Sequence, residues 1–150
     1  MSKRQKRTVG AVIKVPVDNY SIHAQILEEM DIVFFDTKSQ KNITAESAVD
    51  FPVLFRIPAN SDAILNGKWL KIGNAIIKDE FTKPIPRFIQ DALNPNKFQI
   101  YHTGKIFQSS KDECIGLECC AVWAVNHIED RIRDYYNGIP NIWLEQLKIK

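Results

Sequence analysis

The chain has few of the features that secreted, membrane-spanning or disulfide-stabilised proteins require. Its 150 residues include three cysteines, an odd number that does not suit a framework of paired disulfides. The longest apolar runs are far too short to span a bilayer. The basic start, MSKRQKRTVGAVIKVPV, lacks the continuous apolar segment and the small-residue cleavage site of a signal peptide. The sequence therefore predicts a cytoplasmic protein with reduced thiols and no membrane association.

The chain also lacks a strong charge of either sign, because its net charge is only +2. Four of the 20 basic residues are Lys3, Arg4, Lys6 and Arg7, and leaving them out gives 16 basic against 18 acidic residues. The body of the protein is thus mildly acidic. Residues 1–8 are expected to form a flexible basic tail, whose attraction to nucleic acid would be weak and salt-sensitive.

No internal repeat, low-complexity tract or linker interrupts the rest of the chain. A composition of 45% hydrophobic and 25% charged residues is typical of an ordinary globular protein. A chain of this length can bury a sizeable core. Residues 9–150 are therefore predicted to fold as a single domain.

Short β-strand signals dominate the first two thirds of the chain. Residues 9–17, VGAVIKVPV, alternate apolar with other residues and are rich in β-branched types, and the turn sequence DNY follows. Residues 97–107, KFQIYHTGKIF, predict a hairpin that turns at HTGK. Further strands are predicted at residues 21–29, 31–36, 51–58 and 67–73.

The C-terminal third mixes helix and strand signals. Ser110 and Glu113 predict a capping box at the start of a short helix, which we expect to end near Gly116. The apolar character of residues 118–125 and 141–149 predicts two more strands.

The clearest helix is predicted over residues 126–137. Asn126 is expected to cap its start, and Gly138, followed by a proline, is expected to end it. Its apolar face would carry Ile128, Ile132 and Tyr135. Together these patterns predict an α+β fold that is mainly antiparallel β, as a meander or a small SH3-like barrel, with one or two C-terminal helices.

All three cysteines lie in DECIGLECCAVWAVNH, residues 112–127, and they allow three interpretations. A structural zinc site usually needs paired C-x2-C ligands, whereas the spacings here are five and one. A catalytic thiol would pair Cys120 with His127 and Asp130. However, His127 begins a predicted helix, where the helix dipole disfavours an imidazolium. Packing of the small side chains beside Trp123 is favoured, so no metal or cofactor is predicted.

An acidic group consists of Glu118, Glu129, Asp130 and Asp134. One interpretation is a solvated helix face, in which neighbouring arginines compensate the carboxylates. The other is a patch that docks a basic partner. Both interpretations remain open, and the four carboxylates are the candidate partner-binding residues.

Residues 116–149, GLECCAVWAVNHIEDRIRDYYNGIPNIWLEQLKI, carry an ordered set of short motifs. Four motifs precede them: VGAVIKVPV, QILEE at residues 25–29, VLFRIPA at residues 53–59 and FIQD at residues 88–91. Their order and spacing are also those of the family that the chain resembles. This set resembles the immunity protein 26 family of bacterial polymorphic toxin systems over nearly the whole chain.

The resemblance implies a small, mostly β cytoplasmic protein that binds and neutralises a cognate toxin without catalysis. A toxin domain would be the partner, while membranes and nucleic acid are not expected partners. Two alternatives remain open: a nucleic-acid-binding module with an SH3-like barrel and a basic tail, and a thiol enzyme that uses Cys119 or Cys120. The identity of the toxin and the oligomeric state do not follow from the sequence.

Overall fold

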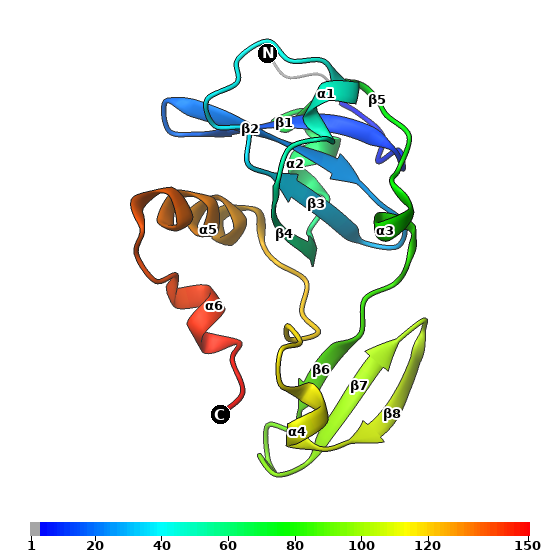
Figure 1. Cartoon of the computed structure of the whole chain (residues 1–150). Helices are drawn as coiled ribbons and strands as arrows, with labels where there is room; N and C mark the ends of the chain where they lie inside the picture. Colours follow the sequence, from blue (N-terminus) through cyan, green and yellow to red (C-terminus); the bar gives the residue numbers. More distant parts are fainter. Residues whose placement is uncertain (1–3) are drawn as a thin grey trace.

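A computed structural model describes residues 4–150, which form two antiparallel sheets and several short helices (Figure 1). The predicted α+β class with mainly antiparallel strands is thereby confirmed. The first sheet has the order β4-β3-β2-β1-β5. Its strands are β1 (Ala11–Val17), β2 (Tyr20–Ile26), β3 (Asp31–Phe35), β4 (Val53–Pro58) and β5 (Leu70–Asn74).

The first four strands form the predicted meander, and the chain then returns to add β5 beside β1. Tight turns join β1 to β2 and β2 to β3, and each contains a residue with positive φ, Asp18 at 52° and Glu29 at 57°. β4 and β5 are the two end strands of this order, and β5 pairs antiparallel with β1.

Three one-turn helices fill the connections around the first sheet. They are α1 (Ala45–Ala48), α2 (Asp62–Leu65) and α3 (Asp79–Thr82). The hydroxyl of Thr44 accepts a hydrogen bond from the backbone N–H of Ser47 and thereby caps α1.

The second sheet consists of β6 (Arg87–Gln90), β7 (Phe98–His102) and β8 (Lys105–Ser109), in the order β6-β7-β8. The predicted hairpin at residues 97–107 is confirmed. Its two-residue turn is Thr103–Gly104, with φ values of 54° and 76°. β6 had no sequence prediction, because its four residues are too few to show a period.

Helix α4 (Lys111–Cys114) begins at the predicted capping box. The hydroxyl of Ser110 accepts from the backbone N–H of Glu113 at 3.3 Å, so this prediction is confirmed. Helix α5 (Val125–Asn137) is also confirmed, and Gly138 ends it in the left-handed conformation at φ 68°. Its N-cap is Ala124, and Asn126 lies inside the helix, so the predicted cap was wrong.

Two predicted C-terminal strands are absent from the structure of residues 4–150. Residues 118–125 make only isolated bridges, Ala59 with Trp123 and Phe88 with Cys119. The other segment contains helix α6 (Ile142–Gln146), because Asn141 caps it by accepting from the N–H of Leu144 at 2.9 Å. An N-cap therefore decides the structure of this short apolar segment.

The core lies on both faces of the first sheet. Ile13, Ile22 and Phe34 pack on one face together with Ile128 and Ile132 of α5. On the other face, Val12 of β1 and Val33 and Phe35 of β3 pack together with Ala48 of α1 and Phe81 of α3. Neighbouring side chains along a strand point to opposite faces of the sheet. Because both faces are covered, all five residues of β3 are buried.

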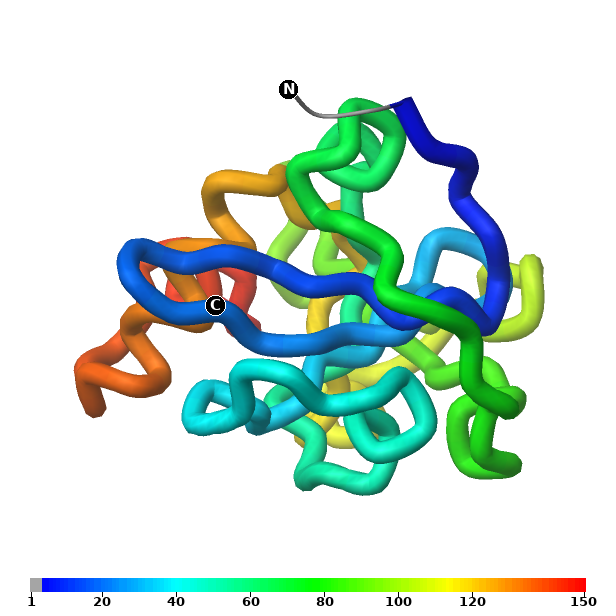
Figure 2. Tube along the Cα trace, turned by 90° about the horizontal axis from the view of Figure 1, so that it is seen from above, coloured from blue at the N-terminus to red at the C-terminus, as the bar shows by residue number. Residues whose placement is uncertain are grey.

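Helix α5 contacts the sheet through a face that differs from the predicted one at its C-terminal end. Ile128 and Ile132 are fully buried, but Tyr135 is 56% exposed. Tyr136 packs inward instead, with its hydroxyl donating to Asp36 at 2.7 Å and its ring against Tyr20. Figure 2 shows the hairpin of β1 and β2 passing over the orange and red C-terminal segments.

Gln5 fastens the start of the described chain to the first sheet. Its side-chain nitrogen donates to the carbonyls of Ile64 and Trp69, both at 2.9 Å, and its oxygen accepts from the N–H of Lys71. Part of the expected basic tail, residues 1–3, lies outside the described residues, and the flexibility of the tail stays a prediction. None of the helices in residues 4–150 combines the length and apolar character that crossing a membrane needs.

Candidate partner-binding surface

Glu118, the first of the predicted carboxylates, forms a two-point ion pair with Arg131 of α5. The distances from the guanidinium nitrogens to the carboxylate oxygens are 3.0 and 3.2 Å. The same guanidinium lies over the rings of Phe55 and Trp123, at 4.2 and 4.9 Å from their centroids. This pair therefore fixes the segment before α5 to the helix itself.

Asp130 and Asp134 hold α6 against α5. Asp130 accepts from the indole N–H of Trp143 at 2.9 Å and pairs with Arg133 at 2.7 Å. Asp134 accepts from the side-chain amide of Asn141 at 2.9 Å. Both carboxylates are thus used to position the C-terminal helix.

Glu129 points in another direction, toward the connection between α2 and β5. Its carboxylate lies 2.8 Å from the ammonium of Lys68 and is only 14% exposed. The structure therefore gives each of the four carboxylates an internal partner, and it does not gather them into one free acidic patch. Sequence spacing placed them correctly near α5, but it could not reveal the partners that approach from other elements.

The cysteines occupy packed positions. Cys114 is completely buried beside Phe88 and Phe98. Burial raises the pKa of the Cys119 thiol, with the neighbouring Cys120 adding to the effect, and burial also raises the pKa of Cys120. A raised pKa keeps a thiol protonated and weakly nucleophilic.

His127 does not serve as a thiol partner in this arrangement. Its ring stacks on Trp143 with centroids 3.7 Å apart and planes 12° apart. Among residues 4–150, no group of three or more histidine, cysteine, aspartate or glutamate side chains is placed to hold a metal ion.

A buried ion cluster connects the two sheets. Asp31 at the start of β3 accepts from Nε of Arg56 at 2.8 Å, and its two oxygens lie 3.2 Å from the guanidinium of Arg87 on β6. The three side chains are 7–10% exposed. Because charges out of water interact strongly, this cluster fixes the orientation of β6 against the first sheet.

A groove of about 330 Å³ lies beside this cluster. We call it the inter-sheet groove. Met30 and Val122 are 44% and 52% exposed at its wall, which gives the groove an apolar surface. Its lining residues are Glu29, Met30, Asp31, Pro58, Arg87, Tyr101, Cys120, Ala121 and Val122.

The β2–β3 turn carries two carboxylates, of which Glu29 lines the inter-sheet groove and Glu28 directly precedes it. Glu28 and Glu29 are exposed, and neither forms an ion pair within residues 4–150. Glu29 adopts the left-handed conformation that non-glycine residues rarely take. Together with Met30 they form an exposed acidic and apolar projection, which sequence analysis missed although the letters EEM were visible in the turn.

Comparison with known proteins gives one finding about family. The family model described as Immunity protein 26 matches residues 4–99, which include the first sheet, β6 and the start of β7. The resembling motifs in residues 116–149 lie beyond the matched range. No curated protein and no solved structure matches the chain.

Proposed function

The chain belongs to the immunity protein 26 family, and from this membership we propose that it neutralises a cognate bacterial toxin by binding it in the cytoplasm. Inhibition by binding needs a rigid surface and no chemical step. The buried ion cluster and the packed C-terminal helices supply rigidity in the described residues. The protonated thiols are consistent with a non-enzymatic protein.

The proposed contact surface is the β2–β3 turn together with the inter-sheet groove. Exposed Met30 and Val122 supply apolar area, and the exposed carboxylates of Glu29 at the groove and of Glu28 beside it in the turn supply negative charge. Such a surface suits a toxin segment that presents a basic side chain next to an apolar one. This choice is favoured over the acidic group of α5, because the carboxylates of that group already have internal partners.

Co-expression in bacteria with a candidate toxin, encoded beside the gene for this chain, tests the function. We expect growth to be restored and a one-to-one complex to be recovered by pull-down with the tagged protein. A toxin that remains active in the presence of excess protein would refute the proposal.

Charge reversal tests the surface separately. We expect the double variant Glu28→Lys with Glu29→Lys to raise the dissociation constant of the toxin complex at least about tenfold, because like charges would then meet at the rim. Glu46→Lys is the matched control, since Glu46 is also exposed and makes no ion pair in residues 4–150. Equal loss with the charge reversal Asp130→Lys alone would favour the acidic group instead, provided that variant stays folded.

The nucleic-acid-binding alternative depended on the barrel and the basic tail. Arg7, one of the tail cations, donates to the backbone carbonyl of Asp31 at 3.0 Å and is therefore engaged within the protein.

A further inference from the structure

The four edge strands in residues 4–150 differ in whether another segment hydrogen-bonds to their outer side. The backbone of β5 donates from Lys71 to the side chain of Gln5. At β4, the carbonyl of Pro58 accepts from the N–H of Trp123. Phe88 of β6 exchanges two backbone hydrogen bonds with the segment at residues 118–120. The outer edge of β8 has no such cover among the described residues, and Figure 1 shows no ribbon beyond it.

The register of the hairpin determines which β8 groups face outward. A two-residue turn makes His102 and Lys105 a hydrogen-bonded pair, and bonded pairs recur at every second position. Phe107 and Ser109 therefore direct their backbone groups toward β7. The N–H and C=O groups of Ile106 and Gln108 are directed toward the free edge.

The side chains of this edge strand are unusually apolar for an exposed edge. Ile106 is 57% and Phe107 is 49% exposed, and Lys105 is the strand's one charged residue. Natural proteins usually protect such edges with charges, prolines or covering segments. An unprotected apolar edge with free backbone groups is a site for strand pairing.

We infer that β8 pairs with β8 of a second copy of this chain, antiparallel about a two-fold axis at Phe107. In that register, each Ile106 lies opposite Gln108 of the second copy, and these two pairs exchange four backbone hydrogen bonds. The two Phe107 residues form the central non-bonded pair, where side chains come closest and an aromatic contact is favourable. The two three-stranded sheets become one six-stranded sheet.

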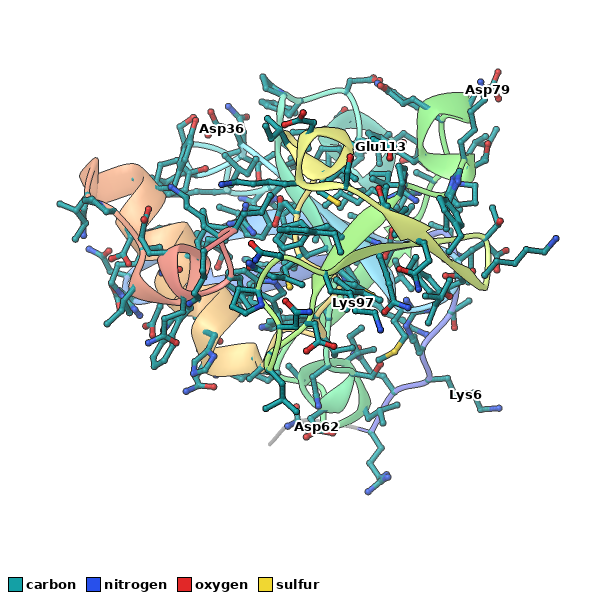
Figure 3. The ribbon with its side chains drawn as sticks, turned by 90° about the horizontal axis from the view of Figure 1, so that it is seen from below. Lys6, Asp36, Asp62, Asp79, Lys97 and Glu113 are labelled. Atoms are coloured by element: carbon teal, nitrogen blue, oxygen red, sulfur yellow. The ribbon has the colours of Figure 1, made fainter. Side chains whose placement is uncertain are left out.

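Charge complementarity supports a second copy as the occupant. The same register places Lys105 opposite Ser109 of the second copy. The Ser109 hydroxyl lies 3.3 Å from the carboxylate of Glu113, so the ammonium meets a negative charge twice by symmetry. Figure 3 shows Glu113 beside the point where β8 passes into α4. No like charges oppose each other along the strand.

The contact is short, so the dimer is expected to be weak. Five residues per strand are paired, and interfaces of small area belong to the weak and transient class. We therefore expect a dissociation constant of about 10⁻⁶ to 10⁻⁴ M for the dimer.

Sedimentation velocity on the full chain across this concentration range tests the inference. We expect the mass to rise from one chain to two, and Gln108→Pro to abolish the rise because proline removes an outward N–H. Gln99→Glu, on the middle strand β7, is a control that changes surface charge but leaves the edge intact. A mass of one chain at every concentration would overturn the inference.

A charge exchange keeps the test decisive if the proline variant fails to fold. Lys105→Glu should shift the dissociation constant at least about tenfold toward monomer, because each new carboxylate would meet Glu113 of the second copy. Adding Glu113→Lys should restore most of the lost dimer affinity, which a merely structural effect would not do. Failure of the double variant to recover would contradict this register, and a monomer whose Gln108→Pro variant loses toxin binding would assign the edge to a toxin strand instead.

Discussion

The buried carboxylate of Asp31 forms ion pairs with two guanidinium groups. Its carboxylate is the shared partner of Arg56 and Arg87, which come from different sheets. A buried ion pair contributes little compared with an apolar replacement, but removing one partner leaves an uncompensated charge. The cluster is therefore more sensitive to single substitutions than its net contribution to folding suggests.

We predict that Asp31→Asn lowers the free energy of unfolding by about 3–5 kcal/mol, because both arginines lose their counter-charge. Urea denaturation measures this loss. Asp50→Asn is the matched control, since its pair with Lys78 is 71% and 40% exposed and is worth at most about 1 kcal/mol. Similar losses for the two variants would show that Asp31 is not a buried charge centre.

His23 gives the fold a pH dependence. It is 1% exposed, and its Nδ1 lies 2.8 Å from the hydroxyl of Thr37. Burial lowers the pKa of His23 below the ordinary value of 6.5, and the charge of Lys14 lowers it further. The folded state then resists a proton that the unfolded chain accepts, so stability is complete above about 6.5 and falls as the pH decreases below it.

We predict that His23→Gln removes this part of the pH dependence, whatever its effect on the absolute stability. Urea denaturation at a series of pH values below about 6.5 measures the slope. His102→Gln, in the half-exposed end of β7, is the control for the loss of a histidine outside the core. An unchanged slope in His23→Gln would assign the pH dependence to other groups.

At the scale of elements, local signals predicted local structure well. The hairpin at β7 and β8, the capping box of α4 and the C-cap of α5 depend on residues within a few positions of one another. Sequence analysis failed where a segment is held by residues that are far from it in the sequence. The polar anchors of α6, at Asp130 and Asp134, cannot be read from residues 141–149 alone.

The same limit explains what was predicted of the candidate site. The acidic group was found by composition near α5, but its ion pairs with Arg131 and Lys68 depend on how the chain folds back. The inter-sheet groove brings together Met30, Tyr101 and Val122, which are far apart in sequence. No local period can reveal such a surface.

We predict that Asn141→Ala loosens α6 without unfolding the protein. The substitution removes the N-cap bond to Leu144 and the bond to Asp134, and loss of a cap costs about 1 kcal/mol. Hydrogen exchange should speed up in residues 142–147 while the strands of the first sheet stay protected.

Asn137→Ala is the matched control for that measurement. Asn137 is the last residue of α5, and its side chain makes no hydrogen bond recorded within residues 4–150. Faster exchange throughout the first sheet in Asn141→Ala would show that α6 is part of the global folding unit.

At the scale of the whole molecule, the residues that the family model matches do not include the whole core. The match ends at residue 99, inside β7. Trp123, Ile128 and Ile132 lie beyond it, yet they belong to the core on one face of the first sheet. The C-terminal third is thus required to cover the sheet that carries the match.

We predict that a chain ending at residue 99 shows no cooperative thermal transition, because that apolar face would be exposed to water. Circular dichroism during heating measures the transition. A chain ending at Leu147 is the control, because it keeps α5 and α6. It loses the bonds between Gln90 and Lys150, the ion pair of Lys148 with Glu145 and the packing of Ile149 on the second sheet, but none of the core on the first sheet. A sharp transition in the shorter chain would contradict the prediction.

The position of those three core residues also affects how the protein is made. A ribosome delivers the first sheet before it delivers Trp123, Ile128 and Ile132, and synthesis proceeds at about 5–20 residues per second. For several seconds, the nascent meander therefore holds an uncovered apolar face that chaperones can bind. The folded protein appears only after α5 has emerged, so a chain released before Ile132 keeps that face exposed to water.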